Sequence, residues 1–401
     1  MRKHNMKKQA GFTLVEFIVA MGVTLVVLGG ATIAFKDTVR ANQFVTMSED
    51  MNENLRAGLN LMEQDLIQAG TGIPTGGILI PSTSNGNLTN ACNIGAPISR
   101  PNAQPTGSGT PAAPALLFNT FNPCSFTLPA IEPGPDLGPL ITSPDSTPAT
   151  GTDIITVLFA DNSLSLDTTP INRPAASPIP ACNGTISNAG DVVTFDPNCI
   201  NFSTALISFT PGDLILFNNS RGSALQAVTT VGSQSLSFAA GDPYNLNARI
   251  NTDTSGTIAC IRTNNNPVPN SACSNIPCPG SGSCYPPTTA TRIWMVTYYL
   301  DNASDPNHAR LVRRVNFQPG QPVGETLENL QFAYNYKDST NTPPTGQPGV
   351  PAGFSESQIR SVNVSLGARS TSPNPSSGKY LRDSLTTQVS FRSLAFVNRY
   401  N

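Results

Sequence analysis

One uninterrupted apolar stretch near the start of the chain constrains its fold more than any other feature. Gly11 to Phe35 reads GFTLVEFIVAMGVTLVVLGGATIAF, and Glu16 is the single charged residue in it. As an α-helix rising about 1.5 Å per residue, Phe12 to Phe35 would be roughly 36 Å long, which is enough to cross the hydrocarbon core of a bilayer. The sequence therefore predicts a membrane-spanning helix.

The charges before this stretch predict its orientation. The ten residues that precede Gly11 include no acidic side chain and four basic ones, Arg2, Lys3, Lys7 and Lys8. Basic residues beside a membrane span stay on the cytoplasmic side. We therefore expect a single-pass membrane protein with its N-terminus cytoplasmic and the residues after Phe35 facing outward.

Two simpler interpretations of the apolar stretch are less satisfactory. A cleaved signal peptide usually has a shorter apolar region and a small-x-small cleavage site, for which Thr32 and Ala34 are a poor match. A plain signal anchor explains the hydrophobicity and the orientation but not Glu16. A carboxylate costs about 2.5–3.5 kcal/mol at the membrane centre and less towards its edge. Glu16 therefore predicts a partner for its charge.

The residues around Gly11 resemble the processing signal of type IV pilins and pseudopilins. Lys8 to Glu16 reads KQAGFTLVE. In that family a prepilin peptidase cuts after the glycine, the new N-terminal phenylalanine is N-methylated, and a glutamate at the fifth mature position docks each subunit into the filament. The resemblance implies cleavage between Gly11 and Phe12, methylation of Phe12, and Glu16 as the assembly carboxylate. It also implies a precursor in the inner membrane that later joins a pilus at the cell surface. The α-amine of one subunit is a natural partner for a buried carboxylate on the next.

The helical pattern continues past Phe35 and becomes amphipathic. Apolar side chains recur every three or four residues, which places them on one face, namely Phe44, Met47, Met51, Leu55, Leu59, Met62, Leu66 and Ala69. Gly70 and Pro74 then end the helix. The prediction is a leader (1–11), a transmembrane helix half (12–35) and an amphipathic half (36–70) that packs on a folded domain. Gly29 and Gly30 serve either close helix packing or a loosening of the helix during assembly.

The rest of the chain divides by composition. Residues 71–150 hold fourteen prolines and four charged residues, which indicates an irregular region with short strands near Ile78–Ile80 and Leu116–Phe118. Residues 151–401 are predicted to be a β-rich ectodomain. Its strand-like runs are Ile154–Ala160, then Asp213–Phe217, Leu225–Val231 and Ser235–Phe238 as a meander, then Trp294–Leu300, Leu311–Phe317, Leu330–Tyr336, Val362–Ala368 and Gln388–Phe396. A long helix packed on antiparallel sheet with long Pro/Gly-rich loops is α+β in class.

Several ectodomain segments resemble those of PilW-like minor pilins, in the same order. They are Pro211–Leu216 (PGDLIL), Ala224–Thr229 (ALQAVT), Val296–Leu300, Leu311–Arg314, Leu327–Tyr334, Gln358–Val362 and Val389–Ser393. The family usually ends its last strand in an Arg-Asn pair, whereas Ser393 follows Arg392 here. The resemblance implies a non-enzymatic minor pilin of a type IV pilus that works with other minor and major pilins in priming assembly, near the tip.

The cysteines indicate disulfides. All eight follow the apolar stretch, at Cys92, Cys124, Cys182, Cys199, Cys260, Cys273, Cys278 and Cys284. An even number in an extracytoplasmic chain favours disulfide bonds, although the sequence leaves their pairing open. Proximity favours Cys92–Cys124, Cys182–Cys199 and two bridges within Cys260–Cys284. Zinc is the alternative for the last four, but their spacing contains no C-x-x-C pair, so no metal site is predicted.

Little in the sequence supports an enzyme. His308 is the only histidine outside the leader and lies in a polar turn, with no nucleophile–base pair beside it and no phosphate-binding glycine loop. Asp301 and Asp305 in the same turn lack the alternating pattern of a calcium loop. We therefore predict no catalytic residue and no cofactor.

Binding functions remain as alternatives. Without the leader the chain has 19 basic and 25 acidic residues, which argues against non-specific DNA binding, although Arg310, Arg313 and Arg314 could form a local basic patch. Tyrosines that alternate along strands, at 298, 299, 334 and 336, are more typical of packing than of base or sugar stacking. The two alternative functions are a tip subunit that binds a surface or DNA ligand through 71–150, and a minor pseudopilin of a type II secretion system.

Overall fold

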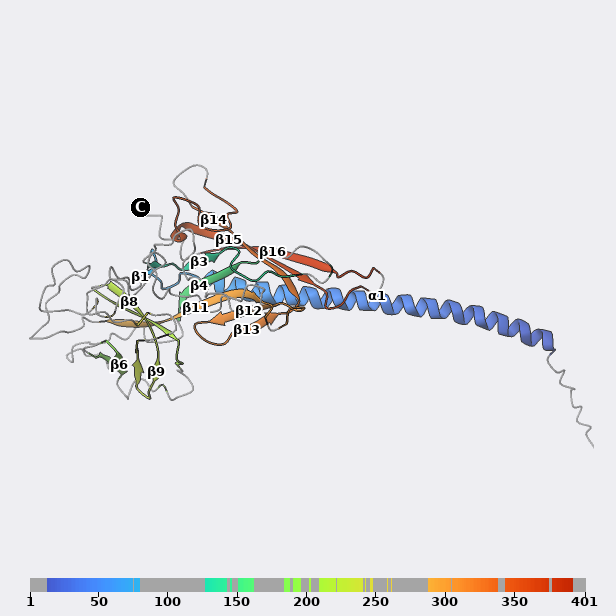
Figure 1. The fold of residues 1–401 in the computed structure, drawn as a ribbon, viewed down its shortest axis with the longest axis horizontal. Coiled ribbons are helices and arrows are strands. Elements are labelled where there is room, and N and C mark those ends of the chain that lie inside the picture. The colour runs from blue at the N-terminus through green and yellow to red at the C-terminus, as the bar shows by residue number, and fades with distance from the viewer. Residues whose placement is uncertain are drawn as a thin grey trace, which may run out of the picture.

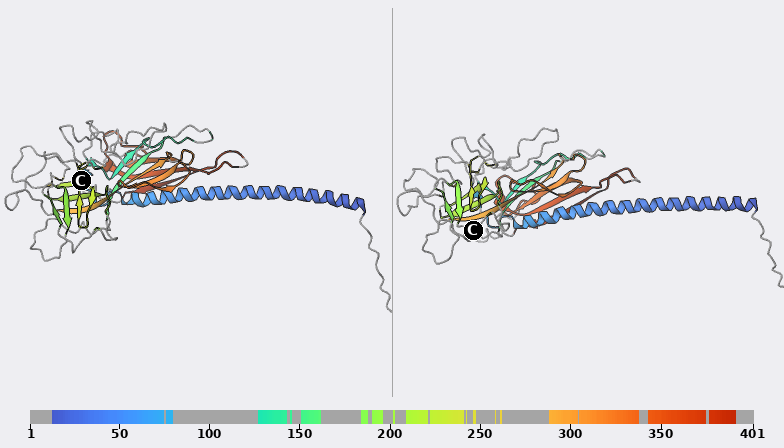
Figure 2. Two further views of the ribbon diagram at one scale, coloured as in Figure 1. Left: turned by 60° about the horizontal axis from the view of Figure 1, so that its bottom comes forward. Right: turned by 90° about the horizontal axis from the view of Figure 1, so that it is seen from below.

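The computed structural model of the chain confirms the α+β class: one long helix runs into a β-rich body (Figure 1). It describes residues 13–74, 76–79, 127–142, 145, 151–161, 184–187, 190–195, 202, 209–220, 222–240, 242, 246–247, 258, 261, 288–303, 305–337, 343–374 and 377–391. The helix, α1 (Leu14–Gln68), has 55 residues and is continuous through Gly29 and Gly30. Its first half projects from the body, and its second half is built into it (Figures 1 and 2).

The end of α1 is fixed by glycines that follow it. Gly70 and Gly72 have φ angles of 81° and 71°, a left-handed conformation that glycine adopts without strain. The Gly70 N–H donates to the Leu158 carbonyl at 2.8 Å, which ties the helix end to a strand. A Cβ on Gly72 would lie 2.5 Å from the Cβ of Ala160. Only glycine therefore fits at this close approach.

The predicted apolar face of α1 is buried over most of its length. The buried residues are Met51, Leu55, Leu59, Met62, Leu66 and Ala69, whereas Phe44 is 46% exposed and Met47 is half-buried. The body thus covers the helix from Met51 onward. Gly58 marks a close approach, because a Cβ there would lie 2.8 Å from the Leu311 Cδ2 atom.

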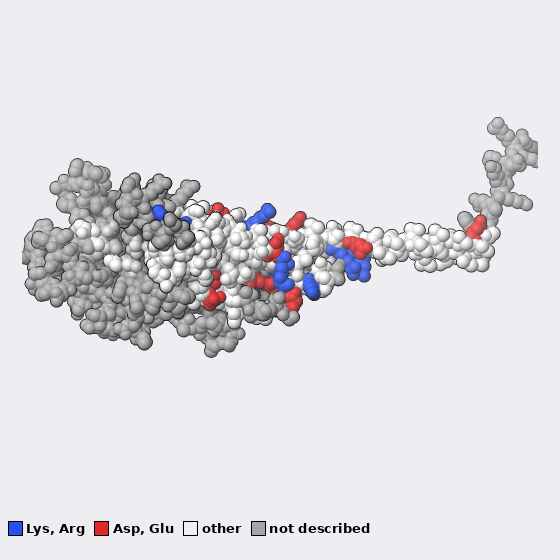
Figure 3. All heavy atoms as spheres, turned by 90° about the horizontal axis from the view of Figure 1, so that it is seen from above, with Lys and Arg blue, Asp and Glu red and all other residues white. Residues whose placement is uncertain are grey.

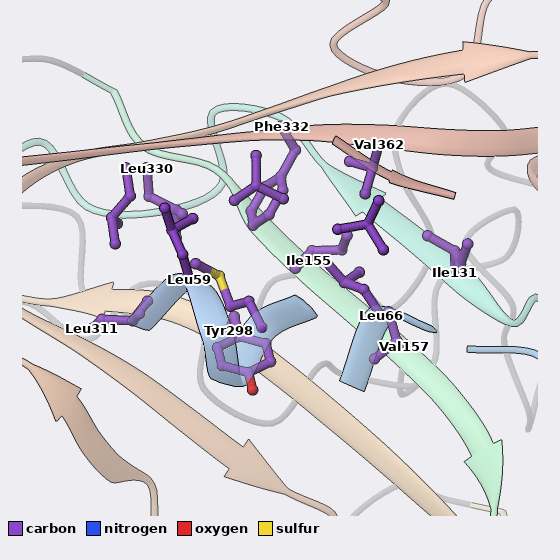
Figure 4. Packing of buried hydrophobic residues seen from close by; sticks show 14 of the residues in the cluster. Leu59, Leu66, Ile131, Ile155, Val157, Tyr298, Leu311, Leu330, Phe332 and Val362 are labelled. Carbon is purple, nitrogen blue, oxygen red and sulfur yellow. The ribbon is translucent and has the colours of Figure 1, made fainter. Parts of the chain in front are cut away.

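Two antiparallel sheets share one hydrophobic core with this helix face (Figure 4). The main sheet has the order β13 (Gln321–Gly324), β12 (Arg310–Val315), β11 (Thr289–Asp301), β4 (Ile154–Ala160), β3 (Ile131–Gly134). The second sheet has the order β14 (Leu327–Tyr336), β15 (Ile359–Arg369), β16 (Arg382–Ser390), with the 3₁₀ turn η2 (Glu356–Gln358) before β15. Tyr298 from the main sheet and Phe332 from the second sheet enter the same core as Leu59 and Leu66 of α1.

A distal lobe is inserted between β4 and β11, at the end of the body away from the start of α1. Its hairpin of β7 (Leu214–Asn219) and β8 (Gly222–Ala227) pairs with the first residues of β11. A separate four-stranded sheet contains β5 (Gly184–Ile186), β6 (Val192–Phe195), β10 (Ser235–Ser237) and β9 (Thr230–Val231), in that order. Its own core includes Phe195, Phe217 and Phe238. A short pair, β1 (Ile78–Leu79) with β2 (Thr127–Leu128), lies nearby.

Most predicted strands are confirmed. Ile154–Ala160 is β4 residue for residue, and the runs in β7, β11, β12, β14 and β15 lie where their patterns placed them. The alternation is visible in β14, where every second side chain from Leu330 to Tyr336 is buried. These strands were readable because one face meets the core and the other does not.

Three strand predictions were wrong or incomplete. The predicted meander divides between two sheets, since β8 ends at Ala227 and β9 pairs with β10 instead. The predicted strand Gln388–Phe396 is confirmed only over its first three residues, since β16 (Arg382–Ser390) begins earlier, where exposed Ser and Thr side chains conceal the pattern, and 392–396 lie outside the described residues. The strand Ile131–Gly134 was missed, since a Pro-Gly sequence at a sheet edge does not look like a strand. Leu116–Phe118 lies outside the described residues.

Asp153 connects the two sheets through a buried carboxylate. Its Oδ1 accepts the Asp136 N–H at 2.9 Å and its Oδ2 accepts the Phe332 N–H at 2.8 Å. Its own N–H donates to the Leu330 carbonyl at 2.9 Å. Burial raises the pKa of Asp153 to about 6, because loss of water disfavours the charge more than the two N–H donors favour it.

The Asp153 carboxyl should make stability fall as pH rises. Its folded pKa of about 6 exceeds the unfolded value of 3.8, so the folded state binds more protons between these values. Its contribution is fully favourable below about pH 4 and decreases by about 3 kcal/mol as pH rises to 7. We expect Asp153→Asn to remove this slope in urea unfolding of the detergent-held chain, whereas the exposed-site control Asp383→Asn should keep it. An unchanged slope in Asp153→Asn would refute the assignment.

Candidate functional site: the N-terminal helix and its docking on the sheet

The first half of α1 is an apolar surface that the described part of the chain does not cover. Every residue from Leu14 to Phe35 is exposed, with Leu14 at 76% and Phe35 at 72%. Figure 3 shows this half as an uncharged rod with a single acidic residue at its end. Among the described residues, α1 is the one helix that is long and apolar enough to cross a membrane.

The polar groups within this rod are satisfied by the helix itself. The Thr24 hydroxyl donates to the Ala20 carbonyl, and the Thr32 hydroxyl donates to the Leu28 carbonyl, both at 2.7 Å. Such bonds let threonine lie in hydrocarbon without an unpaired donor. Glu16 is thus the one residue of the rod that carries a full charge.

Glu16 closes a capping box at the start of α1. Its Oε2 atom accepts the Thr13 N–H and the Thr13 hydroxyl, each at 2.9 Å, and the Glu16 N–H donates to the Thr13 Oγ1 at 3.3 Å. This arrangement satisfies helix-end donors and directs the carboxylate back towards the start of the chain. The pattern Thr-x-x-Glu indicates such a box in the sequence. The sequence analysis predicted only a partner on another subunit for Glu16 and missed this bond within the chain.

The other predicted processing and disulfide residues lie outside the described residues. These are Gly11 and Phe12 at the cleavage and methylation position, and all eight cysteines, Cys92, Cys124, Cys182, Cys199, Cys260, Cys273, Cys278 and Cys284. Cleavage, methylation and disulfide bonding therefore stay predictions.

A buried ion pair fixes α1 on the main sheet. Asp65, buried on the helix, accepts bonds from the Arg313 Nε at 2.6 Å, from the Arg313 Nη2 at 3.0 Å and from the Tyr298 hydroxyl at 2.5 Å. Burial, together with the neighbouring Asp65 charge, raises the pKa of Tyr298 well above its usual range, so its hydroxyl stays a donor. The pair lets α1 dock in one position along the sheet. Sequence reasoning missed it, although an acid three residues after Met62 and one before Leu66 interrupts the apolar face.

The Gly-Asp pair of the PGDLIL segment joins the distal lobe to the main sheet. Asp213 is buried and accepts bonds from Arg292 at 2.6 Å and from the Asn316 amide at 3.1 Å. Gly212 has a φ angle of 93°, and a Cβ there would lie 2.5 Å from the Cβ of Phe317. The segment therefore has a structural role where the distal lobe joins the main sheet.

The candidate binding residues of the sequence are mostly committed to the fold. The tyrosines at 298, 299, 334 and 336 are all buried, as the packing interpretation predicted. Of the three arginines named for a possible basic patch, Arg313 pairs with Asp65, Arg314 is buried with its guanidinium 5.0 Å from the Phe317 ring centre, and Arg310 is half-buried. Neither the tyrosines nor Arg313 and Arg314 offer a free face to a nucleic acid.

The polar turn after β11 shows an isolated contact. The His308 Nδ1 lies 2.8 Å from the Asp305 Oδ2, and both side chains are close to half exposed. No group of three or more metal-ligating side chains occurs among the described residues.

Comparison with known families bears on the start of the chain. Residues 6–32 match the prokaryotic N-terminal methylation motif. The motif indicates a type IV pilin or pseudopilin. Together with the apolar half of α1, it fits a membrane-anchored precursor that prepilin peptidase processes and that associates with other pilins. No curated protein and no solved structure matches the chain significantly.

The ion pair at Asp65 can be tested by removing its charge. Asp65→Asn should lower the free energy of unfolding by about 2–3 kcal/mol, because Arg313 would be left without its anion in a site that is 22% exposed. Denaturant unfolding of the detergent-held chain measures this. The matched control Glu53→Gln, on the exposed face of the same helix, should change stability by less than about 0.5 kcal/mol. Equal effects of the two variants would contradict the role given to Asp65.

Proposed function

We propose that this chain is a structural, non-enzymatic minor pilin of PilW-like type that helps to prime a type IV pilus. One observation carries the proposal. A helix that is fully exposed and apolar over its first half, with one carboxylate at its start, is built by its second half into the core of a globular body. Such a helix needs a bilayer first and the helices of other subunits afterwards.

Processing would prepare Glu16 for assembly. Prepilin peptidase would cut after Gly11, remove the four basic residues of the leader and create an α-amine on Phe12, which is then methylated. Glu16 already bonds to the N–H of Thr13, the residue after Phe12. Its carboxylate therefore lies close to where the new amine forms, and a neighbouring subunit's amine could replace the internal bonds. The capping box would hold the charge until that exchange.

The shape of the molecule supports a position near the tip. The apolar half of α1 and the distal lobe lie at opposite ends of the molecule (Figures 1 and 2). When the helix joins a bundle of pilin helices, the lobe would point along the filament, away from the membrane. The lobe has its own core and joins the body through β11 and Asp213. It extends the body at that end.

Substitution of the carboxylate tests the assembly role. Glu16→Ala should be cleaved normally but be recovered from sheared filaments at least about tenfold less than the unsubstituted chain, since a lost charge-assisted pair costs about 1.5–3 kcal/mol. N-terminal sequencing and immunoblotting of the sheared fraction measure both outcomes. Glu49→Ala, an exposed acid on the same helix beyond the apolar half, is the matched control. Full incorporation of Glu16→Ala would refute the docking role.

A second candidate is a tip subunit that binds a surface or DNA ligand, and the β1–β2 pair makes it testable. Leu79 lies opposite Thr127 across this pair, so the chain leaves and re-enters the body at neighbouring positions. Residues 80–126 can therefore be replaced by a short glycine turn, which also removes Cys92 and Cys124 together. A deletion as far as residue 150 would destroy β3 and its buried Ile131.

We expect the chain without 80–126 to fold and to support piliation. Its melting temperature should change by a few degrees at most. The β1–β2 pair would still be joined, and the entropy cost of closing the connection between two strands depends only weakly on its length. Lost attachment or DNA uptake with intact pili would assign binding to 80–126. Lost pili with a folded protein would place 80–126 in priming. A defect in protein secretion in place of piliation would favour the pseudopilin alternative.

A further inference from the structure

The hairpin between β15 and β16 reaches down α1 towards its apolar half. Its tip, defined here as Ser370–Asn374 and Ser377–Leu381, is seen in dark red beside the blue helix (Figure 2). The Ser372 hydroxyl lies 3.9 Å from the Met47 sulfur. Asn374 lines a shallow hollow of about 260 Å³ with α1 residues, which are Asp37, Arg40, Ala41 and Phe44. The hairpin turns back at this level, where the Asn374 N–H donates to the Lys379 carbonyl at 2.8 Å.

The length of α1 sets the height of this tip above a membrane, given the insertion that the proposed function requires. Leu14 to Phe35 spans about 33 Å as a helix, and the hydrocarbon core is roughly 30 Å thick. The headgroup layer adds about 5–7 Å on each side. Lys36 to Arg40, the first turn after the span, therefore lies among the headgroups. Asn374 of the hairpin tip borders the same hollow as Asp37 and Arg40 of this turn.

The chemistry of the tip suits phosphate-bearing headgroups. Lys379 and Lys36 are exposed, and Ser370–Leu381 contains no acidic residue. Asp37 lies 4.0 Å from Arg40 and offsets that charge, so the two lysines remain in excess. The next acid on α1 is Glu49, about 13 Å beyond Arg40 along the helix. Asp383 follows Lys379 by four residues, which is about 13 Å in an extended chain. Both distances exceed the screening length of about 8 Å at physiological salt.

We propose that the hairpin tip and the first turn of α1 after Phe35 form a second membrane contact, which binds anionic phospholipid headgroups of the outward-facing leaflet. A single helix leaves a globular body free to tilt and to rotate about the span. A second contact beside it restricts both motions. The body then presents one fixed face to other subunits before it leaves the bilayer, and extraction into a filament breaks this contact.

Amide hydrogen exchange of the full chain in vesicles tests the proposal. The probes are neutral phosphatidylcholine vesicles and vesicles that also contain phosphatidylglycerol. Each lysine at an anionic surface contributes about 1 kcal/mol, which corresponds to about fivefold. We expect the amides of Ser377–Leu381 to exchange about fivefold more slowly on the anionic vesicles, and this difference to vanish at high salt and in Lys379→Gln. Lys337→Gln, an exposed lysine at the end of β14, should retain it.

The failures are distinguishable. If the chain floats with both kinds of vesicle but the tip exchanges equally on them, the lipid contact is refuted and membrane insertion stands. If the chain does not float with vesicles, the span itself is refuted and this inference with it. Slow exchange of the tip in assembled filaments alone would assign the tip to a neighbouring subunit and overturn the lipid contact.

Discussion

The structure depends on a change of solvent along one helix. Up to Phe35 every side of α1 is exposed and apolar, and from Met51 onward only one face is apolar and that face is buried. The second half anchors the helix in a core that two sheets share, with Leu55, Met62 and Leu66 fully buried. Burial of such side chains contributes about 1.5–3 kcal/mol each. The exposed half is therefore held rigidly on a body that can stay outside the membrane.

Buried carboxylates position the parts that this core brings together. Asp65 fixes the helix on the main sheet, Asp153 connects the main sheet to the second sheet, and Asp213 connects the distal lobe to both β11 and the turn after β12. Apolar packing is tolerant of small shifts, whereas loss of a hydrogen-bond donor to a buried carboxylate lowers the free energy of unfolding by about 1–3 kcal/mol. These three groups therefore select one arrangement among several that would bury similar apolar area. Their common position at junctions explains why each is buried.

The same rigidity gives the proposed roles a common basis. Glu16 lies at the far end of a continuous helix, the hairpin tip lies beside that helix at Met47, and the distal lobe lies at the opposite end. Movement at any junction would uncouple these three. A minor pilin that primes a filament would need such fixed geometry, because its helix must enter a bundle while its body defines where the next subunit fits. The proposed function rests on the placement of these parts.

The sequence predicted the elements whose signals lie within the element itself. The helix, its amphipathic face and the strands β4, β11, β14 and β15 were predictable, because burial on one side imposes a period of 3.6 or 2 on the sequence. The capping signal of Thr13 and Glu16 is local as well, although we did not predict the capping bond. The edge strand β3 and the first part of the edge strand β16 were not predictable, because Pro, Gly, Ser and Thr there leave no such period. The division of the expected meander between two sheets depended on partners far away in the chain.

By itself, the sequence determined that an apolar span with a basic leader and one acid starts this protein, and that a helix face behind it must be covered. These follow from composition and spacing, which act within a few residues. Tertiary structure alone decided what covers that face, which arginine neutralises Asp65, and that a hairpin more than 300 residues away lies beside the end of the span. The physical reason is that an ion pair or a contact between distant segments costs chain entropy that only the complete core repays.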